Sequence, residues 1–115
     1  MTGFKHPDDL PKPVCRRTIR KYQLETVAEQ ILKLPKSRVL RHFGAQYLTP
    51  CAWFEVDPQS ELEDVRIVMF GTGSRIPEDP PFMERGTYYT YLGTRQSRGD
   101  FAELVRHFYI KEELQ

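Results

Sequence analysis

Two Gly-Thr steps, each followed closely by an arginine, are the part of this sequence best suited to hold a ligand. Residues 69–72 (Met-Phe-Gly-Thr) and 91–94 (Tyr-Leu-Gly-Thr) repeat the same order of two apolar residues, a glycine and a threonine. A strand that ends in this way can turn its backbone N–H groups outward as a nest for an anion, and arginine adds a two-pronged donor for phosphate or carboxylate. If the two strand ends are neighbours, we expect a small-ligand site for an anionic metabolite or nucleotide, formed by Thr72, Gly73, Arg75, Gly93, Thr94, Arg95 and Gln96. The plainer alternative is that each glycine only allows a strand to end at positive φ.

Aromatic residues gather around a long segment, residues 73–86 (GSRIPEDPPFMERG), which contains three prolines and two glycines. Loops of this length in a small domain are usually functional or mobile. Tyrosines in loops and edge strands commonly serve recognition, since they offer a large apolar ring with a polar tip. The pattern therefore predicts a protein-binding surface that includes Ile76, Phe82, Tyr88 and Tyr89.

Charge is divided unevenly along the chain. Residues 1–46 hold ten basic and four acidic residues, whereas residues 47–115 hold seven and twelve. Basic strands with interleaved aromatics can bind single-stranded nucleic acid by charge and stacking. The candidate residues for such binding are Arg16, Arg17, Arg20, Lys21, Arg38 and Arg41. The alternative, which the acidic second half favours, is that the two halves interleave in one sheet and neutralise each other.

Other reactive side chains do not form a catalytic or metal-binding set. Trp53, Glu55 and Asp57 share one face of an expected strand, but nothing completes an acid–base pair around them. His6, His42 and His107 are far apart, and no histidine lies at ligand spacing from a cysteine or an acid. Cys15 and Cys51 read as free thiols of a reducing compartment. We therefore expect no enzyme, no cofactor and no metal.

Length and composition indicate one ordinary domain. The chain has 115 residues, 39% of them hydrophobic and 29% charged, with a formal net charge of +1. No apolar run approaches a membrane span, and the proline-rich start does not resemble a secretory signal. We expect a flexible N-terminal arm over residues 1–15, a single β-rich domain over 16–115, and a cytoplasmic location without a membrane partner.

Short β-like segments separated by turns predict the fold. Strands are expected over 18–24, over 38–48 with a bulge at Gly44, over 51–56 and over 65–70, and over 87–92, which Gly93-Thr94 would end. Residues 24–34 and 101–110 fit either a strand or a short capped helix, because their apolar residues also recur at helical spacing. The expected fold is mainly β, a small antiparallel β-sandwich or open barrel of six to seven strands with at most one short helix.

Several short blocks occur in an order that resembles a family of small phage and prophage proteins of unknown function. The blocks are KYQLE at 21–25, LP at 34–35, WFEVDP at 53–58, FGTG at 70–73 with IP at 76–77, and YLGT at 91–94 with Gln96. The resemblance spans residues 17–110 and implies a phage or prophage origin, a β-rich domain, and strands rather than helices over 24–34 and 101–110. It implies no activity.

Together these observations predict a non-enzymatic accessory or inhibitor protein of phage type. It would bind a host or phage protein through residues 72–86 and the adjacent aromatics. The alternatives are the anionic-ligand site at the Gly-Thr steps and nucleic-acid binding by the basic first half. An exposed edge strand would also allow a homodimer.

Overall fold

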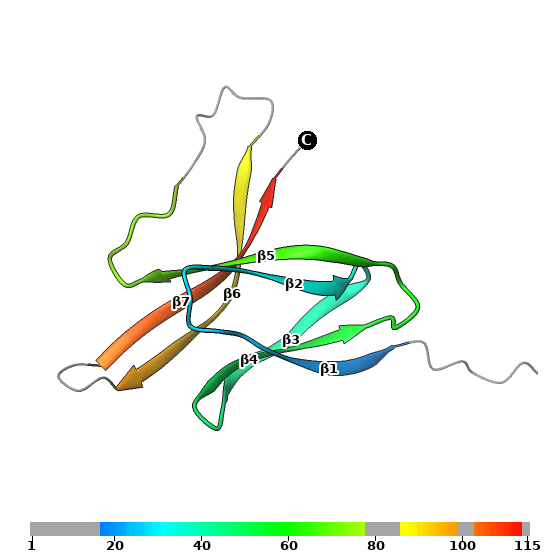
Figure 1. Cartoon of the computed structure of the whole chain (residues 1–115), viewed down its shortest axis with the longest axis horizontal. Coiled ribbons are helices and arrows are strands. Elements are labelled where there is room, and N and C mark those ends of the chain that lie inside the picture. The colour runs from blue at the N-terminus through cyan, green and yellow to red at the C-terminus, as the bar shows by residue number, and fades with distance from the viewer. Residues whose placement is uncertain (1–16, 78–85, 99–102, 114–115) are drawn as a thin grey trace, which may run out of the picture.

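Seven β-strands form two antiparallel sheets (Figure 1). The computed structural model describes residues 17–77, 86–98 and 103–113. The strands are β1 (Thr18–Gln23), β2 (Glu29–Pro35), β3 (Arg38–Gln46), β4 (Thr49–Val56), β5 (Leu62–Gly71), β6 (Thr87–Arg98) and β7 (Glu103–Glu113). The expected arm over 1–15, Arg16 and Phe82 lie outside the described residues.

The first sheet has the strand order β1-β4-β3. Its central strand, β4, buries Ala52, Phe54 and Val56 toward the other sheet. β3 and β4 form a hairpin whose two turn residues, Tyr47 and Leu48, have positive φ values of 51° and 68°. Positive φ at both central residues is the geometry of a type I′ turn, which suits the twist of a two-residue hairpin.

The second sheet has the order β2-β5-β7-β6, and all its neighbours are antiparallel. β6 and β7 are its longest strands and pair from Thr87↔Glu113 to Arg98↔Glu103, with a bulge between Tyr91 and Gly93. Figure 1 shows the last residues of β7 and the first of β6 turning away from β2 and β5. The strand pairing agrees, because β5 meets β7 only from Arg66↔Lys111 onward.

The core lies between the sheets. Phe54 and Val56 from the first sheet meet Ile67, Phe108 and Ile110 from the second, and all five are buried. Alternation explains this arrangement, since every second residue of a strand points to the same face. The Phe43 ring of β3 packs across to Phe108 of β7 in the second sheet, with ring centroids 5.3 Å apart.

The expected β-sandwich is confirmed, and several local predictions need correction. Residues 24–28 form a bend, followed by a strand that ends at Pro35, so the helical alternative is wrong for 24–34 as well as for the described part of 101–110. The bulge in β3 lies between Leu40 and His42 rather than at Gly44. Gly93-Thr94 does not end a strand, because β6 continues to Arg98. Glycine is unfavourable within a strand, but β6 pairs with β7 on both sides of Gly93 and therefore continues through it.

Candidate binding surfaces

His107 joins the two Gly-Thr steps. β7 lies between β5 and β6, and it places His107 opposite Phe70 on one side and Thr94 on the other. The His107 Nε2 atom is hydrogen-bonded to Thr72 Oγ1 at 2.9 Å, and its Nδ1 atom to Thr94 Oγ1 at 2.9 Å. The Tyr91 hydroxyl extends this chain by a hydrogen bond with Thr94 Oγ1. The two threonines therefore do lie together, held by His107, which the sequence did not group with the Gly-Thr steps.

The other residues expected at the anion site do not all lie on the same face as these threonines. Arg95 follows Thr94 along a strand and so points to the opposite face of the sheet, opposite Arg106 of β7. Gly93 also faces inward, where the Phe43 ring lies against it. Gly73 lies at an exposed turn after β5, with a φ of 87°. Arg75 follows it in an exposed stretch without regular structure. Gln96 lies two residues after Thr94 on β6.

Four aromatic rings cover the outer face of the second sheet, the face turned away from the core. We call this the aromatic face and define it by Phe70, Tyr89, Tyr91 and Tyr109. Their rings meet edge to face, with centroids 5.7 Å apart for Phe70–Tyr89, 5.7 Å for Phe70–Tyr109 and 5.3 Å for Tyr91–Tyr109. Such geometry brings the positive ring edges to the negative ring faces and stabilises the cluster. The hydrogen-bond chain through His107 borders this cluster.

Apolar residues extend the aromatic face across β5 and β2. Val68 lies opposite Tyr109 on β7, is only 7% exposed and is not part of the core cluster. Ile31 on β2 and Tyr91 on β6 are 57% and 52% exposed. The described residues contribute no second layer over this face. It is therefore a partly exposed apolar patch, bordered by charged residues such as Arg66 and Lys111, on a sheet whose other face is already packed.

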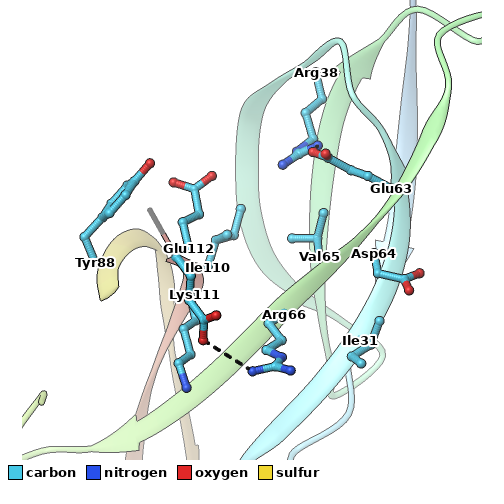
Figure 2. A pocket seen from close by; sticks show the side chains of 11 residues that line it. Ile31, Arg38, Glu63, Asp64, Val65, Arg66, Tyr88, Ile110, Lys111 and Glu112 are labelled. Atoms are coloured by element: carbon cyan, nitrogen blue, oxygen red, sulfur yellow. Dashed lines mark hydrogen bonds and ion pairs between the residues drawn. The ribbon is translucent and has the colours of Figure 1, made fainter. Parts of the chain in front are cut away.

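A cavity of about 530 Å³ lies where the second sheet divides. Leu62–Val65 of β5 pair only with β2, and Glu112 and Glu113 of β7 pair only with β6, so the two strand pairs separate. Figure 2 shows the lining side chains; Tyr88, Ile110, Lys111 and Glu112 come from one arm of the fork and Ile31, Glu63, Asp64, Val65 and Arg66 from the other. We call this cavity the fork.

Most charges that line the fork are already paired. Arg38 contacts Glu63 at 2.6 Å, and Arg66 contacts both Glu29 at 3.4 Å and Glu113 at 3.7 Å. Tyr88 also lines the fork, and its hydrogen bond to Glu112, together with the charge of that carboxylate, raises its pKa. Tyr88 and Tyr89, expected on one surface, thus lie on opposite faces of the sheet.

The basic residues of the first half are largely neutralised by acids of the second half. Glu55 of β4 accepts hydrogen bonds from Arg17 Nε at 2.7 Å and Arg41 Nη2 at 3.2 Å. The hydrogen bond from Arg17 is the main reason that the pKa of Glu55 is lowered, although partial burial acts in the opposite direction. Of the remaining candidates for nucleic-acid contact, Arg38 pairs with Glu63, while Arg20 and Lys21 lie exposed on β1. The charge asymmetry of the sequence thus becomes ion pairs between neighbouring strands.

No cluster of three or more His, Cys, Asp or Glu side chains suited to a metal ion occurs in the described residues. Cys51 is a buried free thiol, and His42 packs on Trp53 with ring centroids 5.1 Å apart. The part of the chain that the structure describes contains no helix of membrane-spanning length and apolarity.

The sequence model of one protein family, described as a domain of unknown function (DUF7352), matches residues 15–115. The chain belongs to this family. No curated protein and no solved structure matches it. Membership in a family without an established function agrees with the expectation from the sequence, while the phage or prophage origin stays a prediction.

Proposed function

We propose that this protein is a non-enzymatic binding module of phage type, which engages a host or phage protein through the aromatic face and the segment that begins at Thr72. The observation that carries the proposal is the four-ring cluster on the outer face of β5, β7 and β6. An exposed patch of aromatic residues is a costly feature on a surface unless a partner covers it. Tyrosine and other aromatics also dominate the energetics of protein interfaces.

The hydrogen-bond chain of Thr72, His107, Thr94 and Tyr91 supports this proposal. It ties the beginning of the 72–86 segment to the border of the aromatic face. Thr72, where that segment begins, and the aromatic face therefore lie on the same side of the sheet, which supports a shared contact surface. A contact surface whose position is set in advance loses less entropy on binding.

Affinity capture from a host lysate, with the captured protein then purified and titrated, tests the proposal. The double variant Tyr89→Ser/Tyr91→Ser removes two rings from the aromatic face, and Tyr47→Ser removes a ring that is 93% exposed at the β3–β4 turn. We expect the double variant to bind at least ~30-fold more weakly, because truncating a hot-spot residue costs ~2 kcal/mol or more. Tyr47→Ser should bind like the wild type. If the double variant binds as tightly as the wild type, or if only Tyr47→Ser binds more weakly, the contact does not lie on the aromatic face.

Size-exclusion chromatography of the same variants separates this function from self-association. An aromatic face that only joins two copies of the chain would give a wild-type dimer that the double variant converts to a monomer, with no captured protein. That result would contradict the proposal.

A further inference from the structure

Two arginines face each other on the inner side of the second sheet without any acid between them. Arg95 of β6 and Arg106 of β7 are direct partners in the register. Like charges directly opposite each other destabilise a strand pair. Elsewhere in the described residues several arginines are matched with acids of the neighbouring strand, as for Arg66 of β5 with Glu29 of β2 and Arg41 of β3 with Glu55 of β4. No described carboxylate pairs with Arg95 or Arg106.

The Arg95 guanidinium is also left with an unused donor. Its Nε atom is buried and has no hydrogen-bond acceptor. A buried donor without a partner costs ~1–3 kcal/mol and calls for a specific explanation. Half-buried Arg95 and Arg106 line a small cavity together with Thr26 of the β1–β2 bend and the ring of Phe108. The cavity holds about 10 Å³, which is the space of one water-sized atom.

We propose that Arg95 and Arg106 bind a phosphate group, one oxygen of which enters this cavity and accepts the hydrogen bond of Arg95 Nε. A phosphate carries a charge of about −1.5 to −2 at neutral pH and would balance two guanidinium groups, whereas a carboxylate would balance one. Planar guanidinium forks also suit phosphate oxygens better than a point charge does. Because the cavity admits one oxygen, the remainder of the ligand stays outside, so inorganic phosphate and a phosphate monoester both fit.

This site differs from the anion site expected at the Gly-Thr steps. It keeps Arg95, replaces Arg75 with Arg106, and lies on the opposite face of the sheet from Thr72 and Thr94. It is also separate from the aromatic face, so phosphate and a protein partner could be bound together. The phosphate site and the protein-binding role of the aromatic face can therefore be disproved independently of each other.

Calorimetric titration with inorganic phosphate at constant ionic strength tests the site, with sodium chloride as the salt control. We expect saturable binding to the wild type and at least ~10-fold weaker binding to Arg95→Gln and to Arg106→Gln, since a charged hydrogen bond contributes ~1.5–3 kcal/mol. Arg20→Gln, an exposed arginine of β1 in the other sheet, is the matched control and should bind phosphate as the wild type does. Titration with adenosine 5′-monophosphate, against adenosine, shows whether a monoester binds as tightly as the free ion.

Thermal unfolding without phosphate provides an independent readout. Arg106→Gln should be at least as stable as the wild type, because it removes the like-charge pair, but it should lose the rise in Tm that phosphate gives the wild type. The proposal fails if phosphate raises the Tm of wild type and Arg106→Gln equally, or if it stabilises the wild type no more than chloride does. Marked destabilisation of phosphate-free Arg106→Gln and Arg95→Gln would also overturn it, since the pair would then serve the fold.

Discussion

The two Gly-Thr steps share the order Gly-Thr, but only the second requires its glycine. After Gly71-Thr72 the chain leaves β5 through a turn, closed by a hydrogen bond from Ser74 N to the Gly71 carbonyl, with Gly73 at φ of 87°. Gly93-Thr94 lies within β6, and a Cβ atom built on Gly93 would come within 2.2 Å of the Phe43 ring. The second step therefore needs its glycine for space between the two sheets, whereas in the first step Gly71 is not constrained in this way and the positive φ falls on Gly73.

The threonines of the two steps, in contrast, do the same thing. Each hydroxyl is hydrogen-bonded to one ring nitrogen of His107. A threonine hydroxyl both donates and accepts, so the pair can satisfy either tautomer of a neutral histidine. The comparison shows that the two copies of a repeated motif can share one role through the threonine while only one of them requires its glycine.

The largest effect is expected from Gly93→Ala. The added methyl group meets the Phe43 ring, which packs against the core, so either the ring or β6 must move. Overpacking of this kind costs ~1–3 kcal/mol, and we expect the upper part of that range because the clash is with ring and Cβ atoms rather than with a flexible chain end. Urea unfolding at equilibrium measures the free energy of unfolding.

Gly71→Ala is the matched control for that experiment. A Cβ at Gly71 would meet only Ser74 Oγ at 3.7 Å, an ordinary contact, so the change should stay within ~0.5 kcal/mol. The double variant Phe43→Leu/Gly93→Ala should recover part of the loss relative to the sum of its single variants, because the smaller side chain makes room. Equal losses in the free energy of unfolding for Gly93→Ala and Gly71→Ala would show that Gly93 has no special need for glycine.

A smaller effect is expected from Gly73→Ala. The new side chain has open space, but a positive φ is unfavourable for an L-residue. We expect a loss of ~1 kcal/mol in urea unfolding. Gly73→Asn should lose less, since asparagine tolerates this region better. If alanine is tolerated without cost, the turn must adopt another conformation.

The smallest effects belong to the threonines. Thr94→Val removes hydrogen bonds to both His107 and Tyr91 and should cost ~1 kcal/mol, whereas Thr72→Val removes one bond and should cost ~0.5 kcal/mol. The imidazole resonances of His107, followed by NMR, should shift in both variants, and the two losses should not be additive. Strict additivity would indicate that the two hydroxyls act independently rather than through His107.

Much of the architecture was predictable from local patterns. The β-like segments over 51–56 and 65–70 correctly predicted β4 and β5, in which Phe54 and Ile67 are buried. The errors concern glycine and helical spacing. Gly93 and Gly44 were assigned to a strand end and a bulge because glycine permits both, yet only the neighbouring strand and the opposing sheet determine which use applies.

The candidate sites were less predictable for a related reason. Residue types indicated that Tyr89 and Arg95 belong to recognition surfaces, but not which residues accompany them. Tyr91 joins Tyr89 by alternation along β6, whereas Tyr109 joins them, and Arg106 joins Arg95, through the β6–β7 register. Tyr88 and Tyr89 are consecutive residues of β6, and alternation along the strand places them on opposite faces of the sheet.

By itself, the sequence determined a single family domain of β-strands, because binary patterning and turn residues act over a few positions and need no distant partner. Only the tertiary structure decided that β7 lies between β5 and β6. That placement brings His107 between two threonines 22 residues apart in sequence and sets Arg106 against Arg95. Register between distant strands depends on which faces are buried together, and this property belongs to the packed sandwich rather than to any one segment.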